Sequence, residues 1–388
     1  MKAKHSFHNR IKGWLPKEPL QTRRIGAASF RSHVTLIFAA TLIVSSAAVS
    51  YIFYFSTPPI QTAPVVADYN PLTTEGLNLH DYIYIKPDGS LWPNASANVL
   101  KVDGLVYTFT QNISNSILIQ RDGITLDGAG YFLVGPGNHG AIELNSVNST
   151  VKNLKIVEFE SGIQATGDYC TICDNYISAN ISLLLRANHL NVTGNYLVNC
   201  LNGKVDVVNP AIQRWHYSVY IEGFDAGCYN YFSNNQIVNF TGAIRMMSSV
   251  GNTITNNNLE NNSIGIELKG GSSNVFYGNN ISQCTEFAVS PYRSNNNIFY
   301  GNNFMDNVNQ VVDACSYILV PKNISSNLWD NGEMGNFWSN YPIEKLQPRQ
   351  TPSIIGNNPY QLYTNNTDHH PLLVPTFFQV SKTEGLGP

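Results

Sequence analysis

The sequence predicts an all-β protein: a single-stranded right-handed parallel β-helix that follows one N-terminal transmembrane helix. Three observations lead to this prediction. An asparagine recurs at intervals of 22, 20, 40, 22, 23 and 23 residues, a brief apolar segment precedes each asparagine, and a run of 22 uncharged residues stands near the N-terminus. Together these features indicate a stack of short coils that is anchored in a membrane.

The recurring asparagines end short segments in the middle of the chain. They are Asn153, Asn175, Asn195, Asn235, Asn257, Asn280 and Asn303. Strands of successive coils lie roughly 4.8 Å apart, so residues at the same position in each coil come to lie one above another. Stacked amides can bond along such a pile, and asparagine tolerates the left-handed backbone of a tight corner. We therefore interpret these residues as an internal ladder that supports the fold, and not as a binding site.

The apolar segments lie some 12 to 14 residues before the asparagines. Their first inward residues are Ile142, Ile163, Leu183, Ile221, Ile244, Ile266 and Val289, followed by Val312. Short alternating runs in a period of about 20 to 24 residues predict coils of β-strand that bury their inward side chains against their neighbours. A leucine-rich repeat shares the period, but its Leu-x-x-Leu-x-Leu frame is absent from this sequence. The composition, with 43% hydrophobic and 13% charged residues, suits a long narrow core.

The uncharged run is Val34–Phe55. At about 1.5 Å per residue, a helix of this length can cross a bilayer core of roughly 30 Å. A cleaved signal peptide is the alternative, because small residues at Ala47, Ala48 and Ser50 could host a cleavage site. The run ends in aromatic residues suited to a membrane interface and is longer than a usual signal core, which favours an uncleaved anchor.

The charges around this run predict its orientation. Of the 23 basic and 26 acidic residues in the chain, 8 and 1 precede the run. Positive flanks stay in the cytoplasm, so the sequence predicts a single-pass cell-membrane protein with a cytoplasmic N-terminus and an extracellular β-helix. The remainder holds 15 basic and 25 acidic residues, a net charge of about −10. An acidic exterior argues against nucleic acid as a partner.

These boundaries divide the chain into six predicted parts. They are a basic cytoplasmic tail (1–33), a transmembrane anchor (34–55), an extracellular stalk (56–80), the β-helix (81–325), a C-terminal cap (326–375) and a tail (376–388). An exported location makes Asn-x-Ser/Thr sequences candidates for glycosylation. The predicted sites are Asn94, Asn112, Asn148, Asn323 and Asn365.

Both ends of the predicted β-helix carry a family resemblance. The entry contains Tyr82–Ser90, Tyr107–Thr110 and Ile117–Tyr131, and the close contains Leu328–Gly332, Gly335–Tyr341, Asn358–Tyr360 and Asp368–Leu372. With these segments the chain resembles NosD-like β-helix proteins of the archaeal cell surface over residues 80–375. The resemblance implies a pectin-lyase-like right-handed β-helix, in a superfamily that groups carbohydrate-binding proteins with sugar hydrolases, but it does not transfer an activity. The family's aspartate-tyrosine ending is altered here to Asp368-His369-His370, a segment that we expect to cover the last coil.

The residue after each inward position should point outward and form a column. In this register the column contains Glu143, Gln164, Leu184, Glu222, Arg245, Glu267, Ser290 and Asp313. A second column contains Asn145, Thr166, Arg186, Phe224, Met247, Lys269 and Tyr292. If no coil intervenes, Glu222, Arg245 and Glu267 form an alternating-charge stack with members about 5 Å apart. Charged groups beside aromatic rings then predict a polysaccharide groove.

The segment Asn202–Ser218 interrupts the repeat and contains an aromatic and basic cluster. We expect it to be a binding loop beside the outward columns; a loop that packs its tryptophan on the flank of the stack is the alternative. The predicted ligand-binding residues are Arg214, Trp215, His216, Glu222, Phe224, Arg245, Glu267, Lys269 and Tyr292.

The catalytic candidates are Glu222 and Glu267, since glycoside hydrolysis uses two carboxylates about 5 to 10 Å apart. The guanidinium of Arg245 between them would hold both ionised, which disfavours an acid role. A lyase that uses calcium would need clustered aspartates, which the sequence lacks. We therefore predict extracytoplasmic binding of carbohydrate or another cell-surface ligand without catalysis. The alternatives are a polysaccharide lyase or glycoside hydrolase, and a purely structural surface protein.

The cysteines and histidines do not form a motif for a metal. Cys170 and Cys173 lie three apart on a predicted strand, on opposite faces, so the pair cannot easily chelate one ion. Buried small side chains, or a disulfide with another coil, are the better interpretation in an exported protein. His139, His189 and His216 are scattered through the chain. We therefore predict no cofactor and no metal site.

Overall fold

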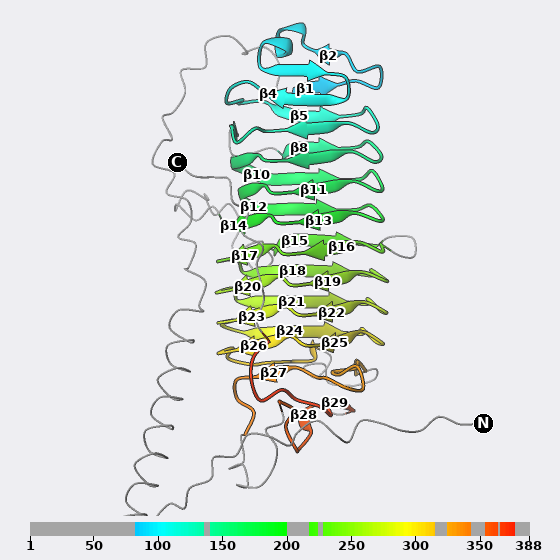
Figure 1. The fold of residues 1–388 in the computed structure, drawn as a ribbon, viewed down its shortest axis with the longest axis vertical. Helices are drawn as coiled ribbons and strands as arrows, with labels where there is room; N and C mark the ends of the chain where they lie inside the picture. The colour runs from blue at the N-terminus through cyan, green and yellow to red at the C-terminus, as the bar shows by residue number, and fades with distance from the viewer. Residues whose placement is uncertain are drawn as a thin grey trace, which may run out of the picture. The chain divides into compact units, whose positions relative to one another are not determined.

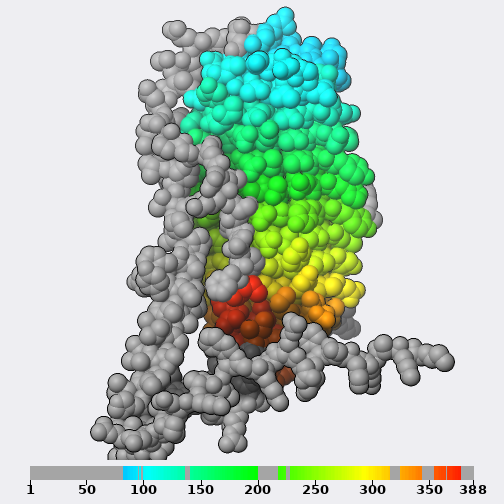
Figure 2. All heavy atoms as spheres, in the orientation of Figure 1, coloured from blue at the N-terminus to red at the C-terminus, as the bar shows by residue number. Residues whose placement is uncertain are grey.

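The described part of the chain is a parallel β-helix, in which successive coils stack along one axis (Figure 1). The computed structural model describes residues 82–135, 140–199, 217–223, 228–314, 324–342, 354–363 and 365–376. In Figure 2 the colours follow one another along the stack in chain order, so coils adjacent in the sequence are adjacent in space. The fold predicted from the asparagine period is confirmed.

Three faces build each coil. The first face contains β1 (Tyr82–Ile85), β5 (Ser116–Ile119), β8 (Gly140–Leu144), β15 (Tyr217–Glu222), β18 (Gly242–Met247), β21 (Ile264–Lys269) and β24 (Phe287–Tyr292), with β2 (Leu91–Trp92) antiparallel to β1. The third face contains β7 (Phe132–Val134), β14 (Tyr196–Val198), β17 (Gln236–Val238), β20 (Asn258–Glu260), β23 (Asn280–Ser282), β26 (Asn303–Met305) and β27 (Phe337–Trp338). The long strands β10 (Lys155–Ala165) and β12 (Tyr176–Leu185) belong to both faces, because each pairs with strands of the two.

The second face is a separate sheet of ten described strands. It contains β3 (Leu100–Asp103), β4 (Val106–Phe109), β6 (Thr125–Asp127), β9 (Thr150–Lys152), β11 (Thr171–Cys173), β13 (Asn191–Thr193), β16 (Tyr231–Ser233), β19 (Thr253–Thr255), β22 (Val275–Tyr277) and β25 (Ile298–Tyr300). A short 3₁₀ helix, η1 (Asn94–Asn98), and a hairpin of β28 (Tyr360–Tyr363) and β29 (Asn366–Asp368) lie at the two ends.

The predicted inward residues from Ile142 to Val289 belong to the core. Except for Val312, the predicted inward side chains are fully buried, and from Ile142 to Leu183 and from Ile244 to Val289 they are direct partners in the register. At the last coil the partner of Val289 is Val311, so the expected Val312 is wrong by one residue. Asp313, which was expected to point outward, is buried and accepts a hydrogen bond from the Ser325 amide at 2.7 Å.

The asparagine ladder is continuous, but three of its predicted members are wrong. Each side-chain amide donates to the side-chain oxygen of the next member at 2.9–3.0 Å. The members are Asn175, Asn195, Asn235, Asn257, Asn279, Asn302 and Asn336. Asn280 and Asn303 follow the true members and begin the next strand, while Leu154 occupies the level expected for Asn153. A period cannot tell which of two adjacent asparagines turns inward.

A second asparagine ladder lies at another corner of the coils and was not predicted from the sequence. Asn252 donates to Asn274 at 2.8 Å, Asn274 donates to Asn297 at 2.9 Å, and Asn297 donates to Asn327 at 2.9 Å. Its upper end is Asn230, whose main-chain amide bonds to Asn252 at 3.0 Å. The signal was present in the sequence, because these residues also recur at 22 or 23 residues until the last step.

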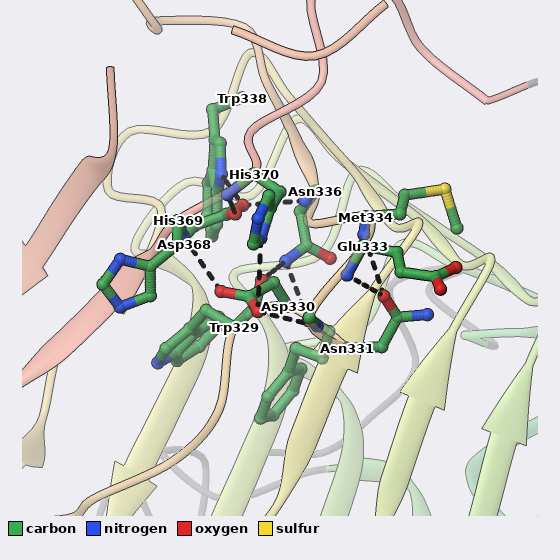
Figure 3. A network of polar contacts seen from close by, with 12 residues as sticks. Trp329, Asp330, Asn331, Glu333, Met334, Asn336, Trp338, Asp368, His369 and His370 are labelled. Carbon is green, nitrogen blue, oxygen red and sulfur yellow. Dashed lines mark hydrogen bonds and ion pairs between the residues drawn. The ribbon is translucent and has the colours of Figure 1, made fainter. Parts of the chain in front are cut away.

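The C-terminal end of the stack is closed by aromatic rings and one buried carboxylate (Figure 3). Trp329 stacks on Phe299 at 4.4 Å and Trp338 stacks on Phe304 at 4.3 Å between ring centroids. Asp368 accepts hydrogen bonds from the Trp338 indole at 2.8 Å and from the Asn336 amide at 2.7 Å. Burial raises the pKa of Asp368, and the charge of Asp330 adds to that increase.

The predicted anchor Val34–Phe55, the cytoplasmic tail and the stalk lie outside the described residues. In the part of the chain that is described, no helix has both the length and the apolar character to cross a membrane.

Replacing Asn257 by alanine should destabilise the β-helix by about 3–5 kcal/mol. Its amide donates to the Phe232 and Thr255 carbonyls, and several buried groups would each lose about 1–3 kcal/mol when unpaired. The measurement is urea denaturation. The control is Asn258→Ala, which removes an outward amide bonded to Asn280 and should cost less than about 1 kcal/mol. Equal losses for the two variants would contradict the ladder's structural role.

Asp368→Asn should remove a pH dependence of stability. Because the folded pKa of Asp368 lies above its ordinary value of 3.8, its stabilising contribution is complete below that value and declines as pH rises through the folded pKa. The wild type should therefore gain stability relative to the variant as pH falls from 7 towards 3.8. Denaturation of both proteins across this range measures the difference. A difference that is independent of pH would refute the assignment.

Candidate functional site

The strand register of the first face determines which outward side chains are neighbours. Val219 pairs with Leu183 on one side and with Ile244 on the other, whereas Ile221 pairs with Leu185 and Met246. The register predicted across the 40-residue interval is therefore wrong by two residues. Val219 and Ile221 are both apolar and inward, so alternation alone could not distinguish them. The segment Asn202–Ser218 also lengthens this interval, so the regular spacing of the other coils could not be used to count residues across it.

This register breaks the predicted Glu222–Arg245–Glu267 stack. Arg245 lies between Tyr220 and Glu267, while Glu222 lies beside Met247, one column away. Lys269 and Tyr292 follow Met247 in the same column, as predicted. Glu222 and Glu267 both belong to the first face, but in different columns.

Arg245, Glu267 and Lys269 form a group of ion pairs on the outer surface of the first face. The Arg245 Nε lies 3.1 Å from Glu267 Oε2, and the Lys269 Nζ lies 3.5 Å from Glu267 Oε1. The side chain of Glu267 is only 9% exposed, against 12% for Arg245 and 28% for Lys269. The carboxylate thus lies beneath two cations, and the lysine is the more accessible of these.

Two tyrosines complete this cluster, and the sequence interpretation missed both. The guanidinium carbon of Arg245 lies 5.2 Å from the Tyr217 ring centroid and 6.0 Å from that of Tyr220. Burial raises the pKa of Tyr217, and the neighbouring charge of Glu267 raises it further. Burial also raises the pKa of Tyr220. Both phenols therefore stay protonated at neutral pH, where they can donate hydrogen bonds but are not bases.

A second ion pair borders the cluster. The Arg186 Nε donates to Glu222 Oε2 at 2.7 Å, with side-chain exposures of 44% and 12%. Tyr292 lies at the far side, with the Arg293 guanidinium carbon 5.2 Å from its ring centroid. We call the group Arg186, Tyr217, Tyr220, Glu222, Arg245, Glu267, Lys269 and Tyr292 the first-face cluster. Arg214, Trp215, His216 and Phe224 of the prediction lie outside the described residues.

The predicted glycosylation sites differ in their exposure. Asn94, Asn148 and Asn365 are exposed. Asn112 is half-buried, and its side-chain oxygen accepts a hydrogen bond from the Phe132 amide at 2.9 Å. Asn323 lies outside the described residues.

The described cysteines are free thiols. Cys170 is buried and Cys173, three residues on, is half-buried. Burial raises the pKa of Cys173 to about 11 and that of Cys284 to about 12. These thiols are protonated at neutral pH and are poor nucleophiles and poor metal ligands. Within the described residues, no group of three or more His, Cys, Asp or Glu side chains could hold a metal ion.

A double-mutant cycle on Arg186 and Glu222 should measure a coupling of about 0.2–1 kcal/mol, as for other exposed ion pairs. Alanine replaces each residue singly and together, and urea denaturation gives the four stabilities. The matched control is the Glu222 and Arg245 cycle, for which the coupling should be smaller because Glu222 lies beside Met247. A larger coupling for the control pair would restore the register predicted from the sequence.

Solved structures with similar folds are distant in sequence. A mutant tailspike protein of E. coli bacteriophage HK620, in complex with a pentasaccharide, is 13% identical with a TM-score of 0.39. The similarity covers 58% of this chain and 47% of the tailspike, so the chain spans about half the length of the tailspike chain. The periplasmic alginate epimerase AlgG is 12% identical with a TM-score of 0.30, over 63% of this chain and 76% of AlgG. No curated protein matches the sequence.

One family model matches part of the chain. It is described as "Periplasmic copper-binding protein (NosD)", and residues 223–342 match it. The matched segment runs from the end of β15 through the last coils to the tryptophans that close the stack. This segment of the parallel β-helix, about a third of the chain, is therefore similar to the NosD family.

Proposed function

We propose that this protein binds an acidic carbohydrate through the first-face cluster, outside the cytoplasm and without catalysing a reaction. The observation that carries the proposal is the Arg245–Glu267–Lys269 group, whose ion pairs lie beside the rings of Tyr217 and Tyr220 on an outer sheet surface. Tyr217 is fully buried against the arginine, whereas Tyr220 is partly exposed, so this surface offers hydrogen-bonding charges and one accessible aromatic ring to a sugar.

The charge of the cluster favours an acidic ligand. The cluster contains three basic side chains, those of Arg186, Arg245 and Lys269. It contains two carboxylates, those of Glu222 and Glu267, so its net charge is +1. The rest of the exported chain is strongly acidic, so this positive surface is locally distinctive. A uronate or sulfate group could bond to the accessible Lys269, while sugar hydroxyls bond to the partly exposed Glu222 carboxylate and Tyr220 phenol.

The strands hold these side chains in place before a ligand arrives. Each residue of the cluster lies in or directly after a strand, and all of these strands except β24, which holds Tyr292, pair with a strand on both sides. The ion pairs restrict the long side chains further. Binding to a preformed surface loses less conformational entropy than binding to mobile loops. The same rigidity suits recognition of a repeated polymer unit.

The electrostatics of the cluster do not favour catalysis. Glu267 is ion-paired with both Arg245 and Lys269, so its carboxylate oxygens are already engaged by cations of the cluster. Glu222 is paired with Arg186 in another column, so the two carboxylates do not face a common bond in the manner of a hydrolase pair. The raised pKa values of Tyr217 and Tyr220 disfavour proton abstraction by a phenolate.

An extracytoplasmic position is part of the proposal. The uncharged run Val34–Phe55 would anchor the chain, the basic tail would stay in the cytoplasm, and the β-helix would face outward. The exposed Asn94, Asn148 and Asn365 would then be accessible to glycosylation. The partners in this scheme are the membrane and a cell-surface polysaccharide, and nucleic acid is not one of them.

Lys269→Ala should weaken binding of an acidic polymer by about tenfold, which corresponds to about 1.4 kcal/mol. The probes are hyaluronan and polygalacturonate, with neutral dextran for comparison, and the readout is binding to immobilised polymer. The matched control is Lys152→Ala on the second face, which removes another ion-paired lysine, 3.3 Å from Asp127, and should leave binding unchanged. Absence of binding to both acidic polymers, or equal losses for the two variants, would refute the proposal.

A further inference from the structure

The column that contains Arg245 and Glu267 continues without a break to the N-terminal end of the described stack. Each strand contributes one residue to this column, and that residue is the direct partner of the column residue in the neighbouring strand. Its members are Trp92, Tyr84, Leu118, Glu143, Gln164, Leu184, Tyr220, Arg245, Glu267 and Ser290. Glu267 and Ser290 are buried, and the other members are exposed or partly exposed at the outer surface. We call this row the central column.

The N-terminal end of the central column is aromatic. Trp92 is 37% exposed, although indole rings are usually well covered in folded proteins. Its ring meets the edge of Tyr84 at 5.3 Å between centroids, and Tyr82 lies 6.0 Å from Tyr84. The Tyr82 hydroxyl donates to Glu143 Oε1 at 3.0 Å, so a carboxylate in the same column lies next to these rings.

We infer that Trp92, Tyr84 and Glu143 form a second subsite, which binds neutral sugar rings of the same polymer that the first-face cluster holds by an acidic group. This inference rests on the proposed function. Aromatic faces suit the apolar faces of sugar rings, and a carboxylate accepts hydrogen bonds from their hydroxyls. Glu143 would repel a uronate, so this end selects neutral units.

The distance between the two subsites requires a polymer. Eight strand steps separate Trp92 from Glu267 in the column, which at about 4.8 Å each is roughly 38 Å. The ligand would lie along the solenoid axis, with its chain following the column. Beside the column, the Thr166 hydroxyl donates to the Asn145 side chain at 2.8 Å, so polar groups flank the path between the subsites.

Graded hyaluronan fragments test the inference, because this polymer alternates acidic and neutral sugars. Fragments with extended lengths above about 40 Å can reach both subsites. Trp92→Ala should weaken their binding to the full-length protein about tenfold and leave short fragments unaffected, since linked subsites add affinity only when both are engaged. Trp92→Phe should retain most of the long-fragment affinity.

Tyr169→Ala is the control for loss of an exposed aromatic ring. Tyr169 is 57% exposed and stacks on His189 at 4.8 Å, between β10 and β11 and away from the central column. Its replacement should change binding of neither length, and circular dichroism verifies that all variants are folded.

The outcomes separate the two proposals. If Lys269→Ala weakens binding while Trp92→Ala affects long and short fragments alike, or neither, the second subsite is wrong and the proposed function stands. If wild-type protein binds long and short fragments equally well, the polymer alignment is wrong. If no acidic polymer binds at all, both proposals fail.

Discussion

The buried asparagine ladders are the interaction on which the rest of this structure depends. A corner between two β-faces turns main-chain amides and carbonyls away from the sheet, where they need partners inside the core. An inward asparagine supplies both a donor and an acceptor. Asn235, for example, donates to the Val192 carbonyl and to the Asn257 side chain, while its own oxygen accepts from Asn195. Each coil is thereby fixed in register with the next.

The fixed register between coils also determines how the outward side chains are arranged on the surface. When the inward residues of successive coils coincide, the outward residues form straight columns, and side chains far apart in the sequence become neighbours. Arg245 and Glu267 are 22 residues apart and form a nearly buried ion pair. Arg186 and Glu222 are 36 residues apart and still meet, because β12 and β15 pair directly.

The ends of the stack meet a different physical requirement from its middle. Every interior coil is covered by two neighbours, but the terminal coils would expose their core. At the C-terminal end Trp329 and Trp338 cover the phenylalanines of the last coils, and Asn366 and Asp368 accept hydrogen bonds from the two indoles. At the N-terminal end η1 and β2 are added to the stack, and β2 brings Trp92 to the outer surface. The same closing element thus places an aromatic residue in line with the charged cluster.

Much of this protein could be predicted from the sequence, because a period is a property of the chain that does not depend on contacts. The 22-residue spacing indicated the β-helix, most inward residues and the pairing of Arg245 with Glu267 and of Lys269 with Tyr292. It could not decide between neighbours with the same chemistry: Asn279 or Asn280 in the ladder, and Val219 or Ile221 in the core. Only the tertiary structure decided these, since hydrogen bonding between coils selects one register among those that the apolar pattern allows. In that register Glu222 pairs with Arg186 instead of Arg245, Tyr217 and Tyr220 lie beside Arg245, and Trp92 lies in the same column as Tyr220 and Arg245.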